Sequence, residues 1–251
     1  MSYKRLISRL DHKGDSLIKG IQLEGLRNLG KLENWITNYY QSGVDEILLL
    51  DAVASNFGSP SIHETIRKVT EKCFVPITVG GGIRNLQDAD SLFRVGADKV
   101  ALNTAAIQSP SLIQSIAEKY GTQAVVVSVE AKKTESGQWL CYVDNGRERT
   151  DISVEEWIAR ADSLGAGEFL VTSIDQDGTL RGPDHDLLLA CRKVSNRPMV
   201  ASGGFKSNLE IQEVLSDFDY QGVALGSALH YNKLSLPELR FQLKSAGVEV
   251  R

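Results

Sequence analysis

The sequence predicts an α/β protein that folds as a single (β/α)8 barrel, or TIM barrel, made of two similar halves. Apolar runs of about five to seven residues alternate with amphipathic stretches of about ten, the pattern of parallel strands joined by helices. The chain has 251 residues, a length typical of this barrel. Short segments also recur about 122 residues apart, which indicates an internal repeat.

The strands are assigned to the apolar, β-branched runs, and each helix to the amphipathic stretch that follows a strand. The eight expected strands cover residues 4–10, 45–51, 75–80, 98–102, 124–130, 167–172, 198–202 and 221–225. The eight expected helices cover residues 33–42, 60–72, 86–94, 110–119, 153–163, 185–194, 208–215 and 236–245. Because they alternate without a linker, we expect one domain over residues 1–251, with half-repeats of about 1–122 and 123–251.

The repeat consists of three pairs of segments at nearly the same interval. The pairs are VDEILL at 44–49 with AGEFLV at 166–171, VGGGI at 79–83 with ASGGF at 201–205, and VALNTA at 100–105 with VALGSA at 223–228. Glycines that follow a strand give backbone N–H groups close access to a phosphate, although a single such glycine pair would indicate only a tight turn. Because the arrangement is duplicated, it favours two phosphate sites, and hence a ligand with a phosphate at each end.

The two expected phosphate sites use glycines together with small polar residues. The first consists of Gly81, Gly82, Asn103 and Thr104. The second consists of Gly203, Gly204, Gly226 and Ser227, supported by Asp177, Gly178 and Thr179.

Two connections are longer than the others, and both follow strands, so they are expected on the C-terminal face, where barrel active sites form. Residues 11–32 are rich in glycine and are expected to form a mobile lid, in which Lys19 could cover an anionic substrate or simply be an exposed surface lysine. Residues 131–151 contain an alternating apolar run followed by Asn145-Gly146, which predicts a hairpin.

Two carboxylates end strands that the repeat places at equivalent positions across the barrel mouth. Asp11 ends the first strand and Glu130 ends the fifth. Opposed carboxylates can act as general acid and general base when their surroundings separate their pKa values. Lone acids at loop starts are commonly just solvated, but the symmetric placement favours catalysis. Asp51, at the end of another strand, is a further candidate for binding the substrate.

The opposite, N-terminal face has four charged residues at strand starts, two of each sign. They are Arg5, Glu46, Lys99 and Glu168. Charges at the bottom of a barrel are usually solvated, but these four would face one another across the axis. The pattern predicts a salt-bridged ring that could act as a gate.

Composition excludes several classes of protein. The net charge of −4 provides no basic field for nucleic acid or an acidic membrane. No apolar run approaches the length of a membrane span, and the N-terminus lacks a signal-peptide pattern. The three cysteines and four histidines are scattered, so we expect no disulfide, metal site or cofactor and assign the chain to the cytoplasm.

Six segments match one known family: KG at 19–20, EGLR at 24–27, TVGGGIR at 78–84, GADKV at 96–100, DGT at 177–179 and AGVEVR at 246–251. Through them the chain resembles, along essentially its whole length, the cyclase subunit of imidazole glycerol phosphate synthase (the HisF family). The resemblance implies a lyase or cyclase of histidine biosynthesis in a glutamine amidotransferase complex. A glutaminase (HisH-like) subunit on the N-terminal face would send ammonia through the barrel. The substrate would be a bisphosphorylated ribulosyl-formimino carboxamide nucleotide, and the products imidazole glycerol phosphate and an aminoimidazole carboxamide nucleotide.

The resemblance also implies roles for individual residues. The four charged residues of the N-terminal face match the family's gate, and Asp98 matches a residue of the glutaminase contact. Asp11 matches one catalytic carboxylate, and the other catalytic position falls on Glu130, where the family has aspartate. A second departure is SRLD at 8–11, where proline-cysteine-leucine-aspartate is expected.

These departures, together with DNGRE at 144–148, are similar to a paralogous branch associated with sugar amidation (acetamidino formation) for O-antigen and other surface polysaccharides, including lipopolysaccharide. Three functions therefore stay open: the histidine-pathway cyclase, a paralogue that supplies ammonia for sugar amidation, and a non-catalytic scaffold and ammonia conduit. Two separate phosphate sites suit the cyclase substrate better than a nucleotide sugar, whose pyrophosphate is contiguous.

Overall fold

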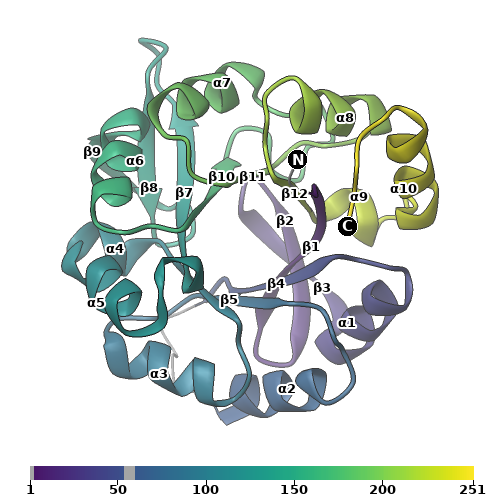
Figure 1. Ribbon diagram of the computed structural model, residues 1–251, viewed down its shortest axis with the longest axis horizontal. Helices are drawn as coiled ribbons and strands as arrows, with labels where there is room; N and C mark the ends of the chain where they lie inside the picture. Colours follow the sequence, from purple (N-terminus) through teal and green to yellow (C-terminus); the bar gives the residue numbers. More distant parts are fainter. Residues whose placement is uncertain (1–2, 54–59) are drawn as a thin grey trace.

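The computed structural model describes residues 3–53 and 60–251, and within them eight parallel strands close into a barrel surrounded by helices (Figure 1). β1 pairs with both β4 and β12, and β7 pairs with β10, so the ring has no open edge. The barrel strands are β1 (Arg5–Lys13), β4 (Glu46–Asp51), β5 (Ile77–Gly80), β6 (Lys99–Leu102), β7 (Val125–Lys133), β10 (Glu168–Ser173), β11 (Met199–Ser202) and β12 (Gly222–Leu225). The predicted (β/α)8 barrel is confirmed.

The helices of the outer ring also lie where the amphipathic pattern places them, each beginning and ending within two residues of its expected bounds. The apolar side of each helix is buried against the barrel, as the 3.6-residue period requires. These helices are α1 (Leu32–Gln41), α2 (Pro60–Thr70), α3 (Leu86–Arg94), α5 (Ser111–Tyr120), α6 (Val154–Ser163), α7 (His185–Val194), α8 (Asn208–Ser216) and α10 (Leu236–Ser245).

Two hairpins extend from the C-terminal face. The expected hairpin after the fifth barrel strand is confirmed: β7 continues into β8 (Trp139–Val143) and β9 (Glu148–Ser153), with Asp144, Asn145 and Gly146 all at positive φ in the connecting turn. The segment after the first strand is not the loop that its glycines suggested. It forms β2 (Ser16–Ile21) and β3 (Glu24–Lys31), which pair with each other, and β2 also pairs with β1.

Among the described residues, three short helical segments were not predicted, because they are too short to show a period. α4 (Thr104–Gln108) follows β6 and α9 (Ser227–His230) follows β12, at equivalent points of the two halves. A 3-10 turn, η2 (Thr122–Ala124), leads into β7. The two short α-helices begin at the small polar residues of the expected phosphate sites.

Helices α3 and α8 begin with the same capping arrangement. The Asn85 side chain accepts the N–H of Asp88 at 3.0 Å, and the Asp88 carboxylate accepts the N–H of Asn85 at 3.3 Å. Likewise the hydroxyl of Ser207 accepts the N–H of Glu210 at 3.4 Å, and the Glu210 carboxylate accepts the N–H of Ser207 at 3.2 Å. Such boxes satisfy free N–H groups at a helix start. Here they fix how the chain leaves the two glycine segments.

The core has two parts. A large apolar layer lies between the strands and the outer helices and includes the fully buried Trp157. A smaller set of side chains fills the barrel axis: Ile7, Leu48, Ala101, Val126, Leu170, Val200 and Ala224. This axial layer separates the N-terminal ends of the strands from the C-terminal ends. In the described part of the chain, no helix combines the length and apolar character needed to cross a membrane.

Candidate active site

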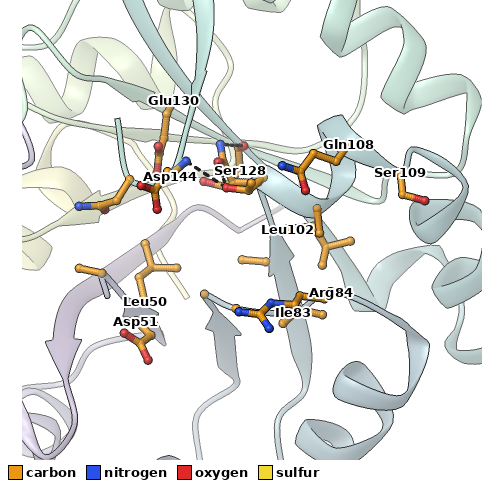
Figure 2. A pocket seen from close by; sticks show the side chains of 18 residues that line it. Leu50, Asp51, Ile83, Arg84, Leu102, Gln108, Ser109, Ser128, Glu130 and Asp144 are labelled. Atoms are coloured by element: carbon orange, nitrogen blue, oxygen red, sulfur yellow. Dashed lines mark hydrogen bonds between the residues drawn. The ribbon is translucent and has the colours of Figure 1, made fainter. Parts of the chain in front are cut away.

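A pocket of about 370 Å³ opens among the C-terminal strand ends and the connections that follow them. Figure 2 shows Glu130, Ser128 and Asp144 along one side of it, with Leu50, Asp51 and Arg84 along the other. The expected Gly81, Gly82, Asn103 and Thr104 also line it. One expected catalytic carboxyl and one expected phosphate site therefore share a single cavity.

Next to this pocket, Asp11 lies in a buried chain of ion pairs. Its Oδ1 accepts from the Arg9 Nε at 2.9 Å, and its Oδ2 accepts from the Lys19 Nζ at 3.0 Å. Lys19 also donates to Asp177 Oδ2 at 2.7 Å. The order is thus Arg9–Asp11–Lys19–Asp177, and each side chain is at least 94% buried.

Lys19 differs from its sequence interpretation as a lysine of a mobile lid or an exposed lysine. It is 2% exposed, because β2 turns its side chain inward between two carboxylates of other elements. Burial alone would lower the pKa of Lys19, but the charges of Asp11 and Asp177 raise it above its ordinary value. Lys19 therefore belongs to the site as a fixed cation.

The two candidate catalytic carboxyls have opposite protonation behaviour. Burial would raise the pKa of Asp11, yet the charges of Arg9 and Lys19 hold it well below its usual range. Glu130 is also buried, and its Oε2 has no hydrogen-bond partner among the described residues. Burial raises the pKa of Glu130 to about 7, against the lowering effects of Arg9 and the Gly146 N–H. Asp11 is thus a carboxylate at neutral pH, while Glu130 can hold and release a proton.

The first expected phosphate site is built by turns that need glycine. Gly81 has φ +97°, and a Cβ there would lie 2.6 Å from the Asp51 carbonyl oxygen. Asn103 serves the scaffold, since its Nδ2 donates to the carbonyl oxygens of Ser128 and Tyr142, both at 3.1 Å. The Asp51 carboxylate accepts the N–H of the nearby Val53 at 2.9 Å.

The second expected phosphate site is tighter. Gly204 has φ +86°, and a Cβ there would lie 2.0 Å from the Gly182 carbonyl oxygen. The hydroxyl of Ser227 is buried and has no hydrogen-bond partner among the described residues. A cavity of about 20 Å³ is lined by residues that include Asp177, Gly178, Gly203, Gly204, Gly226 and Ser227. Thr179 is not among them, and its hydroxyl donates to the Gln176 carbonyl oxygen at 2.8 Å.

At the N-terminal ends of the strands, the four expected charges form a closed ring of ion pairs. Arg5 pairs with Glu46 at 2.7 Å and also with Glu168. Lys99 pairs with Glu46 at 2.9 Å and with Glu168 at 2.8 Å. Asp98 lies exposed beside the ring, where its carboxylate accepts the Ile77 N–H at 2.8 Å.

Sequence reasoning did not assign a role in the site to Arg9 or His230. Arg9 could have been found, because period-two alternation along β1 puts it on the same inner face as Arg5 and Asp11. His230 gave no such signal, since α9 is only four residues long. Its Nδ1 lies 2.7 Å from the Tyr39 hydroxyl, and burial lowers the pKa of His230 to about 4. Among the described residues, no His, Cys, Asp and Glu side chains gather as a metal ion requires.

We predict a pH-dependent stability that arises from Glu130. The folded protein holds this proton up to about pH 7, while an unfolded chain releases it near the ordinary pKa of 4.5. The stabilisation is therefore full below pH 4.5 and is lost as the pH rises through about 7, a change of roughly 2–3 kcal/mol between pH 5 and pH 8. Urea unfolding of the wild type and Glu130→Gln at both pH values measures it, because glutamine does not titrate.

The free energy of unfolding of the wild type, relative to Glu130→Gln, should fall by that amount between the two pH values. Asp144→Asn, which removes an exposed carboxylate from the rim of the same pocket, is the control for the loss of a carboxylate. If the free energies of unfolding of the wild type and Glu130→Gln differ by the same amount at pH 5 and at pH 8, the proton assignment is contradicted.

Comparison with known proteins places the chain among enzymes of amino-acid biosynthesis. The family model described as "Histidine biosynthesis protein" matches residues 5–235. A protein of Legionella pneumophila named imidazole glycerol phosphate synthase subunit HisF is 49% identical over 204 residues, which are 81% of this chain and 96% of that protein.

Proteins with the same name are similar over the full length of the chain. Those of Streptococcus sanguinis (strain SK36) and Dictyoglomus thermophilum are 40% and 39% identical over 251 residues, covering 100% and 99% of the respective relative. These names agree with the first of the three functions that the sequence left open and do not favour the other two. The chain belongs to the histidine biosynthesis family and, within it, to the HisF proteins.

Proposed function

We propose that this chain is the cyclase subunit of an imidazole glycerol phosphate synthase. It would use ammonia to convert a bisphosphorylated ribulosyl-formimino carboxamide nucleotide into imidazole glycerol phosphate and an aminoimidazole carboxamide nucleotide. The full-length similarity to HisF proteins supports this function. Among the features of the site, the strongest support comes from its two carboxyl groups, which lie between two glycine-rich segments. Near neutral pH, Asp11 is ionised and Glu130 can be protonated.

The carboxyl pair divides the proton transfers of the reaction. Addition of ammonia to a carbonyl carbon requires a proton to leave nitrogen and a proton to reach the departing oxygen. Glu130, which is protonated near neutral pH, donates the proton that reaches the departing oxygen. The carboxylate of Asp11 accepts the proton that leaves nitrogen. Both oxygens of Asp11 accept hydrogen bonds from cations in this structure, which keeps Asp11 ionised at the start of the reaction.

Two phosphate groups would anchor the substrate at opposite sides of the mouth. The first phosphate would lie by Gly82 and Thr104, and the second by Gly204, Gly226 and Ser227. The equivalent short helices α4 and α9, and the matching caps of α3 and α8, support the half-repeats of about 1–122 and 123–251 within one domain. A substrate held at both ends places its reacting centre between the two carboxyls.

The N-terminal face would receive ammonia from a glutaminase subunit. The ring of Arg5, Glu46, Lys99 and Glu168 lies on the barrel axis at that face, and Asp98 is exposed beside it for contact with the partner. The proposed location is the cytoplasm, which agrees with the free thiols of Cys73, Cys141 and Cys191.

We predict that anions occupy both phosphate sites. Crystals grown in sulfate or phosphate should show one tetrahedral anion at Gly82 and Thr104 and another at Gly204 and Ser227, because backbone N–H groups at glycine-rich turns and helix starts donate to anion oxygens. Gly204→Ala should abolish the second anion alone, since its Cβ would meet the Gly182 carbonyl oxygen. Density for an anion at only one site, or at neither, would contradict a two-phosphate substrate.

We predict that Asp11→Asn removes most of the ammonium-dependent cyclase activity. One positioned acid–base group contributes about 10²–10⁴-fold, so kcat should fall by that factor while substrate binding survives through the phosphates. The measurement is product formation from the ribulosyl nucleotide and ammonium salt. Asp186→Asn, on the exposed surface of α7, is the matched control. Full activity of Asp11→Asn would show that Asp11 is not a catalytic carboxylate.

We predict that Lys99→Ala impairs glutamine-dependent turnover more than ammonium-dependent turnover in the complex with the glutaminase. Removing Lys99 leaves Glu46 and Glu168 with Arg5 as their only partner in the ring, whereas dissolved ammonia can enter at the C-terminal face. Lys119→Ala, which breaks an exposed ion pair with Asp90, is the control for loss of a lysine. Equal losses in both assays would remove the gate interpretation.

A further inference from the structure

Arg9 is a fully enclosed cation on the barrel axis. It is 2% exposed and projects from the inner face of β1, between the axial layer below and Asp11 above. Its Nη1 donates to Thr172 Oγ1 and to Ser202 Oγ, both at 3.0 Å. Those hydroxyls belong to β10 and β11, neither of which pairs with β1. The guanidinium therefore reaches across the interior and is held there by three strands.

The charges around Arg9 do not balance unless one carboxyl is neutral. Two cations, Arg9 and Lys19, and two carboxylates, Asp11 and Asp177, are already joined in the chain of ion pairs. Glu130 is the third buried carboxyl of this cluster; among the described residues it forms no ion pair, and its Oε2 has no hydrogen-bond partner. An unpaired charge on a buried carboxyl is costly, so the lowest-energy arrangement protonates Glu130.

We propose that Arg9 is a positioning residue for the reaction: by committing its ion pair to Asp11, it makes Asp11 the accepting carboxylate and leaves Glu130 as the carboxyl that holds the proton. The statement about catalysis rests on the proposed function, but the charge assignment does not. Arginine suits this role because its guanidinium does not lose its proton in proteins, so the assignment cannot be undone by neutralising the cation.

Other charged groups nearby do not provide the same control. His12, on β1, lies beside Asp11, and burial lowers its pKa, so it is neutral at pH 7. His230, on α9, is neutral for the same reason. Lys19 is shared between Asp11 and Asp177. The other charged residues that line the pocket with Glu130 are Asp51, Asp144 and Arg84. Arg84 is the one cation of these three, but it is exposed on the opposite side of the pocket, and no ion pair joins it to Glu130 among the described residues (Figure 2).

The pKa shifts agree with the geometry. Arg9 is the strongest of the charges that lower the pKa of Asp11, and it also lowers the pKa of Glu130, although burial outweighs it there. Loss of Arg9 should therefore raise the pKa of Asp11 and the pKa of Glu130. A purely structural role, tying β1 to β10 and β11, would leave both unchanged.

The test is titration of the two carboxyl groups by carbon-13 NMR in the free protein. In the wild type, Glu130 should titrate near neutrality and Asp11 should stay ionised down to strongly acid pH. In Arg9→Met, which keeps length and removes charge, both midpoints should rise by about 1–3 units. Arg9→Lys should bring the midpoint of Glu130 back to within about half a unit of the wild type, because the positive charge is retained. Arg181→Met, which removes an exposed guanidinium from the same face, is the control.

Two outcomes overturn the proposal. One is a wild type in which Asp11 titrates near neutrality and Glu130 below pH 5, a result that needs no variant to fold. The other is a folded Arg9→Met with wild-type midpoints. Activity separates this inference from the proposed function: a wild type without cyclase activity refutes the proposed function, while the titrations still decide the charge assignment. In an active enzyme, the acid and alkaline limbs of kcat/KM against pH should both move upward in Arg9→Met.

Discussion

The ion pairs of Lys19 hold the C-terminal face together. They join three elements: β2, which carries the lysine, β1 through Asp11, and the connection after β10 through Asp177. A lysine buried without carboxylates would be too costly to keep charged, so the β2–β3 hairpin is stable over the mouth only when it delivers Lys19 to them. The Gln22 N–H adds a bond to the Asp177 carbonyl oxygen at 2.8 Å. The position of the hairpin, and the shape of the pockets beneath it, follow from this contact.

Both ends of the barrel contain buried cations and carboxyl groups, but the ratio of cations to carboxyl groups differs between the two ends. At the N-terminal end, two cations face two carboxylates, and every charge has two partners of opposite sign. At the C-terminal end, two cations face three carboxyls, and one carboxyl is left over. In the balanced ring every carboxylate can stay ionised, so no proton is taken up. In the unbalanced cluster one carboxyl binds a proton, because it has no cation to pair with. The same residue types thus make a closure at one end and a proton-transfer site at the other.

Much of this could be predicted from the sequence because it depends on periodicity. The alternation of strands and helices located every barrel element, and the repeat located both glycine segments. The roles of two residues could not be predicted, because they depend on contacts between residues that are distant in sequence. Lys19 lies between Gly14 and Gly20 in a glycine-rich segment, which predicts a lid, and its partner Asp177 is far away in the chain. Arg9 stood out only as an unexpected residue, because its meaning comes from hydroxyls on β10 and β11.

The filled axis has a kinetic consequence for anything that crosses the barrel. The ion-pair ring, the axial apolar layer and the Arg9 guanidinium follow one another along the axis, and among the described residues the side chains of the layer and Arg9 are buried. A small molecule entering at the ring would advance only when buried side chains changed rotamer and left a transient vacancy. The rate constant for its passage would then be set by internal motion of the protein, while the flux would still rise with its concentration outside. Such a barrel would let small molecules pass through its axis one at a time.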